Sequence, residues 1–184
     1  EPILWWSPDP RMVLLPAEFR ISRSLRRCLR SGRFQVRLDS DFVAVIRACA
    51  EVPRAGQGGT WITPAMQEAY WKLFQLGIAH SVETWRDGQL VGGLYGVAIG
   101  RMFYGESMFS LASDASKVAA AHLARFLEEE RFGMIDCQMS TPHLASLGAR
   151  EMPRTVFLER LRTLVSQAWE PGRWPVDAAG QPWT

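Results

Sequence analysis

Residues 92–110 read Gly-Gly-Leu-Tyr-Gly-Val-Ala-Ile-Gly-Arg-Met-Phe-Tyr-Gly-Glu-Ser-Met-Phe-Ser, and this stretch sets the architecture of the chain. It predicts two apolar strands joined by a tight turn at Gly100. The apolar side chains do not alternate strictly along it, which is typical of strands that are buried on both faces. We therefore expect the pair to lie in the middle of a covered sheet.

Two isolated acids fall in apolar strand segments. Glu106 lies among Met and Phe residues, and Asp136 lies in a second apolar segment with Gln138 two positions later. A carboxylate in such surroundings must be paired, or burial raises its pKa. The pattern indicates a site that orders a polar substrate in an apolar pocket, with residues 136 and 138 on one face of their strand. The alternative is that each acid reaches solvent at an edge of the sheet.

The other segments predict a succession of strands and helices. The expected strands cover residues 12–15, 34–38, 79–86, 89–99, 101–109, 134–138 and 151–152. The expected helices cover residues 22–31, a segment capped by Asp39 or Ser40, and residues 63–77, 113–131, 144–148 and 154–167. Three antiparallel strands followed by a helix, a strand and a helix form an α+β arrangement. That order matches the mixed sheet of acetyltransferase-like (GNAT-like) folds, which is flanked by helices.

We divide the chain into three parts. Residues 1–60 are expected to form a small N-terminal α/β portion that carries a basic helix, and residues 61–168 the acetyltransferase-like catalytic domain. Residues 169–184 are rich in Pro, Gly and Trp, and we expect no regular structure there. Residues 52–59 are expected to form a mobile loop. The chain begins with Glu1 rather than Met, so we expect an N-terminal portion to be missing.

The connection from Ser110 to Lys117 argues against a coenzyme A donor. An acetyl-CoA enzyme of this fold would carry a basic, Gly-rich loop there, opening the long helix. This connection has no glycine and contains Asp114. Its backbone amides are therefore less suited to cradle a pyrophosphate, and we expect another acyl donor.

The net charge of +2 conceals a basic helix near the N-terminus. Residues 19–38 contain seven Arg residues and no acid. Four of them recur at the spacing i, i+3, i+4 and i+7 and so share one helical face: Arg23, Arg26, Arg27 and Arg30. Like charges on one stripe repel each other, and a phosphate backbone is the partner that would offset this. The alternative is a solvated face paired with acids elsewhere in the chain.

Composition bounds the remaining possibilities. There is no apolar run near the roughly 20 residues needed to span a membrane. Three cysteines form no close pair, which favours neither a disulfide framework nor a zinc site and suits a reducing cytoplasm. The three histidines form no ligand pattern, so we expect no metal.

Seven segments together resemble the leucyl/phenylalanyl-tRNA–protein transferase family. In chain order they are Trp5-Trp6-Ser7-Pro8-Asp9-Pro10-Arg11, Gly59-Thr60-Trp61-Ile62-Thr63, His80-Ser81-Val82-Glu83, Leu90-Val91-Gly92-Gly93-Leu94-Tyr95-Gly96-Val97, Gly105-Glu106-Ser107-Met108-Phe109-Ser110, Ile135-Asp136-Cys137-Gln138 and His143-Leu144-Ala145-Ser146-Leu147-Gly148-Ala149. Each segment alone is weakly informative, but together and in this order they are specific. The match covers residues 1–165.

The resemblance implies a bacterial cytoplasmic enzyme of the N-degron pathway, which marks proteins for degradation. Such enzymes transfer Leu, Phe or sometimes Met from an aminoacyl-tRNA to the N-terminal Arg or Lys of a protein. The co-substrate is then aminoacyl-tRNA and the partners are acceptor proteins. An aminoacyl ester is already activated, so no cofactor or metal is expected. We also expect a monomer without membrane association.

The resemblance also implies roles for individual residues. Asp136 with Gln138 would take or relay the proton of the attacking amine, and Glu106 would hydrogen-bond an amine or ammonium of the substrates. The four Arg residues of the basic helix would bind the tRNA acceptor arm. The donor pocket would be lined by Trp61, Tyr70, Leu94, Phe103, Met108, Ala120, Leu123 and Ile135, with the first two placed to stack on adenine.

The family also carries an N-terminal segment that is absent from this sequence. It precedes the Pro-Ile-Leu-Trp-Trp stretch, ends in a Phe-Pro-Trp segment and helps to form the aminoacyl-adenosine site. Three alternative functions stay open: a related transferase that prefers acidic acceptor N-termini, a non-catalytic RNA-binding module of the same fold, and an N-acetyltransferase that uses acetyl-CoA. The acids and Gln138 argue against the second, and the connection before the long helix argues against the third.

Overall fold

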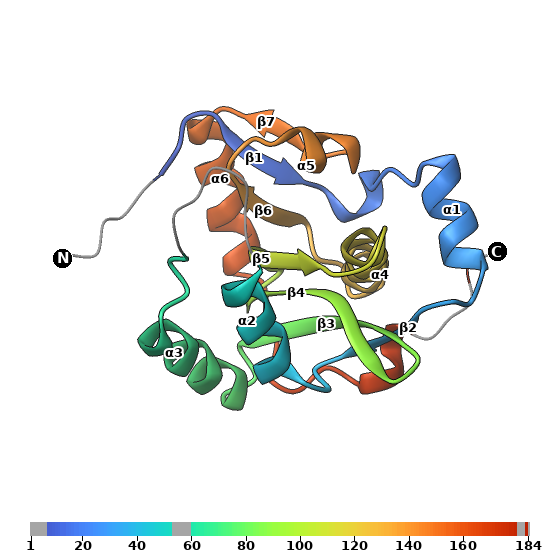
Figure 1. The fold of residues 1–184 in the computed structure, drawn as a ribbon. Helices are drawn as coiled ribbons and strands as arrows, with labels where there is room; N and C mark the ends of the chain where they lie inside the picture. Colours follow the sequence, from blue (N-terminus) through green and yellow to red (C-terminus); the bar gives the residue numbers. More distant parts are fainter. Residues whose placement is uncertain (1–6, 53–59, 180–182, 184) are drawn as a thin grey trace.

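The computed structural model describes residues 7–52, 60–179 and 183 (Figure 1). Residues 53–59 of the loop predicted at 52–59, and the tail residues 180–182 and 184, lie outside the described residues. The same holds for Trp5 and Trp6 of the first segment that carries the resemblance. Within the described part of the chain, no helix is both long and apolar enough to cross a bilayer.

Seven strands of the described residues form one mixed sheet in the order β2-β3-β4-β5-β6-β1-β7. At its centre, β4 (Gln89–Ile99) and β5 (Met102–Ser110) form the predicted antiparallel pair, and Gly100 turns between them at a φ of 57°. β6 (Met134–Gln138) lies parallel to β5. The other strands are β1 (Arg11–Leu14), β2 (Gln35–Leu38), β3 (Ala79–Arg86) and β7 (Arg150–Met152). This topology confirms the predicted GNAT-like α+β sheet.

Helices cover both faces of the sheet (Figure 1). The crossover helix α4 (Ala115–Glu129) packs on one face, and α1 (Arg23–Arg30) packs on α4. The opposite face carries α2 (Phe42–Glu51), α3 (Pro64–Gln75) and α6 (Arg154–Val165). The short helix α5 (Pro142–Ser146) connects β6 to β7, and 3₁₀ turns cover Pro16–Glu18 and Val176–Ala179. β1 and β2 therefore join the same sheet as the central strands, and the division into three parts stays a prediction.

The helix starts show one wrong expectation. Thr63 caps α3 as predicted, accepting from the backbone N–H of Met66. The cap of α2 is Asp41, which accepts from the N–H of Ala44, and not Asp39 or Ser40. Asp39 hydrogen-bonds His80 and Ser81 of β3, and Ser40 hydrogen-bonds Glu83 of β3. The next residue therefore caps the helix.

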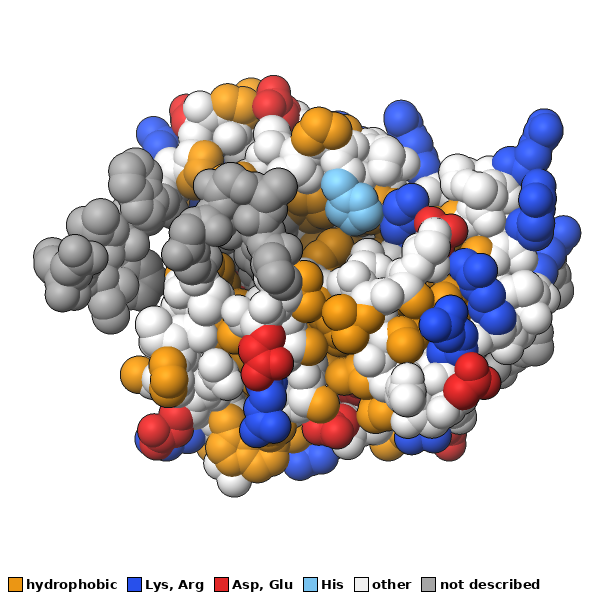
Figure 2. Space-filling model, viewed as in Figure 1, with side chains coloured by type: hydrophobic (Ala, Val, Ile, Leu, Met, Phe, Trp, Pro, Cys, Tyr) orange, Lys and Arg blue, Asp and Glu red, His pale blue; other side chains and the backbone are white. Residues whose placement is uncertain are grey.

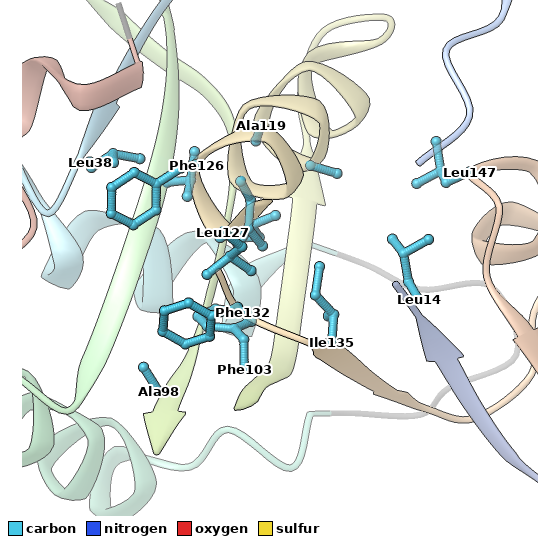
Figure 3. Packing of buried hydrophobic residues seen from close by; sticks show 14 of the residues in the cluster. Leu14, Leu38, Ala98, Phe103, Ala119, Phe126, Leu127, Phe132, Ile135 and Leu147 are labelled. Atoms are coloured by element: carbon cyan, nitrogen blue, oxygen red, sulfur yellow. The ribbon is translucent and has the colours of Figure 1, made fainter. Parts of the chain in front are cut away.

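The largest apolar cluster lies between α4 and the sheet (Figure 3). Leu127 of α4 packs with Phe103 of β5 and Ile135 of β6, all nearly inaccessible to solvent. The small side chains of Ala119 and Ala120 let the helix lie close to the strands. α4 thus holds β5 and β6 on one side while leaving space near Ala120.

Trp174 of the C-terminal tail is part of this cluster. It is 3% exposed, and its ring stacks on that of His80 with the centroids 3.9 Å apart. The centroid of the Phe126 ring lies 4.7 Å from that of Trp174. Its backbone N–H donates to Asp39 Oδ2 at 2.8 Å, and the same oxygen lies 2.8 Å from His80 Nδ1. The tail was expected to have no regular structure, but Val176–Ala179 form a 3₁₀ turn. The tail also closes the core beneath α4.

Trp174→Ala should lower the free energy of unfolding by about 3–5 kcal/mol, because it removes a large buried side chain and leaves a cavity. Urea denaturation followed by circular dichroism measures this. The matched control is Leu76→Ala, since Leu76 is 64% exposed and its truncation should change stability by at most about 0.5 kcal/mol. Equal effects of the two substitutions would show that the tail is not part of the core.

Candidate active site

The site lies where β5 and β6 part. The two strands pair over Met102–Met134, Phe103–Ile135 and Tyr104–Asp136, and their pairing ends there. Beyond that point, residues of both strands line a cavity that extends to α4. The separation of two parallel neighbours opens space inside a sheet that is otherwise covered on both faces.

Two β-bulges lie at this point. The register of β4 with β5 shifts so that Tyr95 pairs with Ser107 and Gly96 with Gly105, which leaves Glu106 as the extra residue. The register of β1 with β6 shifts in the same way, and Cys137 is the extra residue. A bulge bends its strand and re-aims a side chain. Both bulged residues line the cavity.

The cavity has a volume of about 480 Å³ and is mostly apolar. Its wall includes seven of the eight residues predicted for the donor pocket: Trp61, Leu94, Phe103, Met108, Ala120, Leu123 and Ile135. Tyr70 does not line it, but its ring lies 6.3 Å from Trp61 and 5.1 Å from Tyr95. Trp61 is 44% exposed, so it offers an open aromatic face at the mouth.

Glu106 and Gln138 are the polar groups at the parted strands. Gln138 Nε2 donates to the carbonyl of Gly105 at 3.1 Å and more weakly to Glu106 Oε2 at 3.4 Å. Burial raises the pKa of Glu106, and hydrogen bonds from Tyr70 and Gln138 act in the opposite direction. Glu106 is therefore a carboxylate that burial makes more basic than usual and that faces a space large enough for a substrate.

Asp136 lies on the other face of β6. Arg11 Nε donates to its Oδ1 at 2.9 Å and Arg11 Nη2 to its Oδ2 at 2.7 Å. Asp136 is 1% exposed and pairs in register with Val13, which packs under α6, whereas Gln138 pairs with Met12, which packs under α4. The expectation that Asp136 and Gln138 share a face is therefore wrong, because the bulge at Cys137 breaks the alternation.

Asp136 still contacts Gln138 through the backbone. The N–H of Gln138 donates to Asp136 Oδ1 at 2.9 Å, and Gln138 has a φ of 65°. A non-glycine residue in this left-handed region is uncommon and is held there by its surroundings. The ion pair with Arg11 thus fixes the carboxylate that holds the backbone of Gln138.

Several wall residues were not predicted from the sequence. They are Leu14, Tyr95, Gly105, Ser107, Cys137, Met139, Thr141, His143, Leu144 and Leu147. Burial raises the pKa of the Cys137 thiol to about 12, so the thiol stays protonated at neutral pH. Most of these residues lie in the segments that carried the family resemblance, which was the available signal. In residues 7–52, 60–179 and 183, no three His, Cys, Asp or Glu side chains are grouped as for a metal ion.

The predicted Arg face of α1 lies outside the cavity. Its four Arg side chains border a surface hollow of their own: Arg23, Arg26, Arg27 and Arg30. Leu25 and Cys28, on the opposite side of the helix, pack against Val118 of α4. Figure 2 shows Lys and Arg side chains along the edge formed by α1, beside an apolar hollow near the middle of the face. We call these four residues the α1 stripe.

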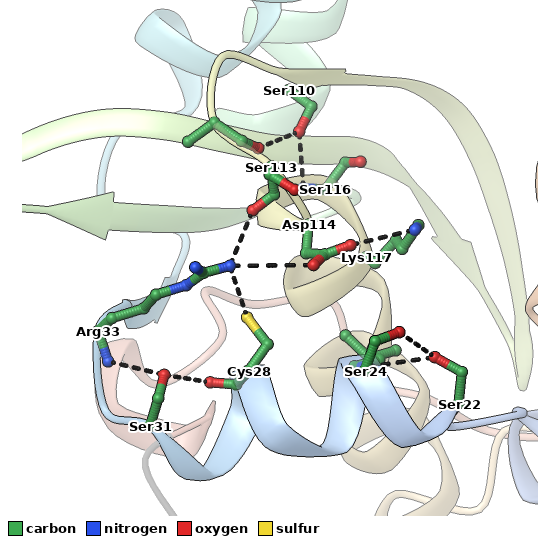
Figure 4. Close-up of polar contacts among 12 residues, drawn as sticks. Ser22, Ser24, Cys28, Ser31, Arg33, Ser110, Ser113, Asp114, Ser116 and Lys117 are labelled. Carbon is green, nitrogen blue, oxygen red and sulfur yellow. Dashed lines mark hydrogen bonds and ion pairs between the residues drawn. The ribbon is translucent and has the colours of Figure 1, made fainter.

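The start of α4 is occupied by ion pairs (Figure 4). Asp114 has a φ of 66° and accepts from Lys117 Nζ at 3.1 Å, and Arg33 Nη2 lies 3.9 Å away. Arg33 also donates to the carbonyl of Ser113 at 3.1 Å. Asp114 is thus held by two cationic side chains, and the expectation that coenzyme A is not the donor stays a prediction.

The fold is GNAT-like, and its parted strands enclose an apolar cavity with a carboxylate and a carboxamide in its wall. The model of the family described as leucyl/phenylalanyl-tRNA protein transferase matches residues 13–162, and the chain belongs to this family of aminoacyltransferases.

Relatives that carry the family's name align along almost the whole chain. The relative from Thiobacillus denitrificans is 63% identical over 97% of this chain and 78% of its own length. The relative from Azoarcus sp. is 59% identical over 98% of this chain and 77% of its own length. The relative from Aromatoleum aromaticum is 60% identical over 98% of this chain and 76% of its own length.

Among solved structures, a conserved protein of unknown function from Staphylococcus epidermidis aligns over 78% of this chain and 57% of its own, at 11% identity and a TM-score of 0.50. A GCN5-related N-acetyltransferase from Kribbella flavida aligns over 79% of this chain and 55% of its own, at 11% identity and a TM-score of 0.46. The fold assignment depends on the strand order and on the parallel crossover from β5 through α4 to β6.

Tyr70→Phe should raise the pKa of Glu106 further, because it removes a hydrogen bond that stabilises the carboxylate. The rise reflects the loss of one hydrogen bond to the ionised form. Carbon-13 NMR titration of the Glu carboxyl carbons measures it, and Glu106→Gln assigns the resonance by its loss. An unchanged or lower pKa in Tyr70→Phe would contradict the proposed hydrogen bond.

Proposed function

We propose that the protein transfers Leu, Phe or Met from an aminoacyl-tRNA to the N-terminal Arg or Lys of acceptor proteins, and so marks them for degradation. The observation that carries this proposal is the apolar cavity with Glu106 and Gln138 at the parting of β5 and β6. It combines a pocket for an apolar donor side chain with polar groups for an amine. The names of the relatives agree with this donor and reaction.

The cavity suits a set of donors more than a single amino acid. Its wall is apolar, and a purely apolar pocket separates side chains of similar size only weakly. The unbranched side chain of Met108 can adapt to Leu, Met or Phe. In the proposal, the exposed ring of Trp61 stacks on the terminal adenine. The ring of Tyr70 packs edge-on against Trp61. The donor ester is already activated, so the proposal includes no cofactor.

The attacking α-amine must lose a proton. Glu106 faces the cavity and accepts hydrogen bonds, so in the proposal it binds the amine and takes part in the proton transfer together with the Gln138 carboxamide. Asp136 does not reach the cavity. It acts through the backbone of Gln138, and we propose it as a positioning residue that keeps this amide aimed at Glu106.

The α1 stripe is the proposed contact for the acceptor arm of the tRNA. Arg side chains bind phosphates in a bidentate manner, and a stripe along one exposed helix can follow a backbone. The protein would then act as a monomer in the cytoplasm, where aminoacyl-tRNA is available. The proposed reaction in the cavity does not depend on the compartment or on the oligomeric state.

The function is tested by transfer of radiolabelled Leu from Leu-tRNA to a peptide that begins with Arg. A peptide that begins with Asp and is otherwise identical is the comparison, and a chain with the family's N-terminal segment is assayed in parallel. Label in the Arg peptide alone is expected. Label in the Asp peptide would select the related transferase, and no label with either chain would favour an RNA-binding module.

Asp136→Asn should lower kcat by about 10–100-fold and change the donor KM by less than about threefold. The carboxamide NH₂ would face Arg11 Nη2, donor against donor, and the charge that pairs with Arg11 is lost. The side chain that accepts from the N–H of Gln138 is then no longer fixed, so Gln138 loses its orientation while the pocket wall stays intact. Steady-state transfer kinetics measure this, and thermal unfolding shows that the variant is folded. An unchanged kcat would exclude the positioning role.

Changing Arg23, Arg27 and Arg30 together to Ala should weaken tRNA binding and flatten its dependence on salt. Each lost phosphate contact reduces the slope of log K against log salt by about 0.7–0.9. Filter binding of Leu-tRNA at a series of salt concentrations measures the slope. Arg160→Ala on α6 is the control, because it removes an Arg charge outside the stripe. A slope equal to that of the wild type would remove tRNA from this helix.

A further inference from the structure

One rim of the cavity carries basic groups that the roles above do not use. His143 of α5 lines the cavity and is half-buried. The pKa of His143 is lowered, first by burial and then by the positive charge of Lys117 on α4. Lys117 is therefore close enough to His143 for its charge to act on the imidazole, although the two residues lie 26 positions apart in the sequence (143 − 117). His143 lines the cavity, and Lys117 lies on α4 one turn before Ala120, which also lines it.

Lys117 lies on α4, the helix that contacts α1 and also forms part of the cavity wall. Along α4, Val118 packs against α1, whereas Ala120 and Leu123 line the cavity. Figure 4 shows Lys117 next to Asp114, above the helix α1. In Figure 2, a His side chain beside the apolar hollow has Lys or Arg side chains between it and the edge formed by α1. A strand bound to the stripe with its end in the cavity has to cross this part of α4.

The local charge favours an anion. Asp114 is shared by Lys117 and Arg33, so the three groups together carry one positive charge. Lys117 is 37% exposed, and an ammonium has three donors, of which the hydrogen bond to Asp114 uses one. The N-terminus of α4, a helix of 15 residues, adds a partial positive charge. His143 adds an N–H donor even when it is neutral.

We propose that Lys117 and His143 form a subsite for the phosphodiester on the 5′ side of the donor's terminal adenosine. This inference rests on the proposed function. The subsite would fix where the nucleic acid backbone enters the pocket, between the phosphate contacts of the α1 stripe and the adenosine at Trp61. It requires a phosphate on the 5′ oxygen of the nucleoside that carries the ester, and it requires no particular base.

The test compares two stable analogues of the donor as competitive inhibitors of transfer from Leu-tRNA. Both carry phenylalanine on the 3′-amino group of 3′-amino-3′-deoxyadenosine, and one of them also carries a 5′-phosphate. The wild type should bind the phosphorylated analogue about tenfold more tightly, as expected of one or two charge-assisted hydrogen bonds. Lys117→Ala and His143→Gln should each reduce this ratio. Lys117 does not line the cavity, so Lys117→Ala should leave the inhibition constant of the unphosphorylated analogue within about twofold.

Two further variants keep the test decisive. Lys117→Arg should retain the preference for the phosphorylated analogue, because it retains the charge. Lys72→Ala is the matched control, since Lys72 is an exposed Lys on α3 that also pairs with a carboxylate. It should leave the ratio unchanged. Thermal unfolding in the absence of analogues shows whether each variant is folded.

The outcomes distinguish a failure of the proposed subsite from a failure of the proposed function. Equal inhibition constants for the two analogues with the wild type overturn the subsite, while transfer from Leu-tRNA still supports the proposed function. A ratio that Lys117→Ala and His143→Gln both leave unchanged also overturns it, because another group then binds the phosphate. Absence of transfer from Leu-tRNA overturns the proposed function and the subsite with it.

Discussion

The arrangement of the site depends on the ion pair between Arg11 and Asp136. It lies at the last paired residue of β5 and β6, and it joins β1 to β6 where the two central strands part. Removing one partner of a buried pair costs about 3–5 kcal/mol, because the other charge is left uncompensated. The same carboxylate holds the N–H of Gln138, so the feature that stabilises the strand end also orients the cavity amide.

Much of the fold is determined by local sequence patterns. The point at which β5 and β6 part is not determined by them. The strands at residues 79–86 and 89–99 have the predicted bounds, because Asp87-Gly88 marks the hairpin and the apolar runs mark the strands. The bulges at Glu106 and Cys137 depend on which residue of a neighbouring strand pairs with which. One inserted residue reverses the faces of all later residues in its strand, so the expectation that Asp136 and Gln138 share a face is wrong.

The tail shows a second limit of sequence reasoning. Its composition indicated no regular structure, yet the tail forms a short 3₁₀ turn at Val176–Ala179. Trp174 packs beside side chains that form the wall of the cavity. The cause is a long-range contact. Asp39 Oδ2 is hydrogen-bonded to His80 Nδ1 and also accepts a hydrogen bond from the backbone N–H of Trp174. Asp39 had the local signature of a helix cap, and the buried acceptor role could be seen only in three dimensions.

The cavity combines two requirements that oppose each other. An apolar wall is needed to bind Leu, Phe or Met, and it raises the pKa of any carboxylate beside it. An amine substrate needs a hydrogen-bond acceptor that is ionised near neutral pH. Hydrogen bonds from Tyr70 and Gln138 offset part of the effect of burial on Glu106. Because Gln138 is held by Asp136 and Asp136 by Arg11, the ionisation of Glu106 is coupled to the strand end that opens the pocket, and both properties would change together if that pair were lost.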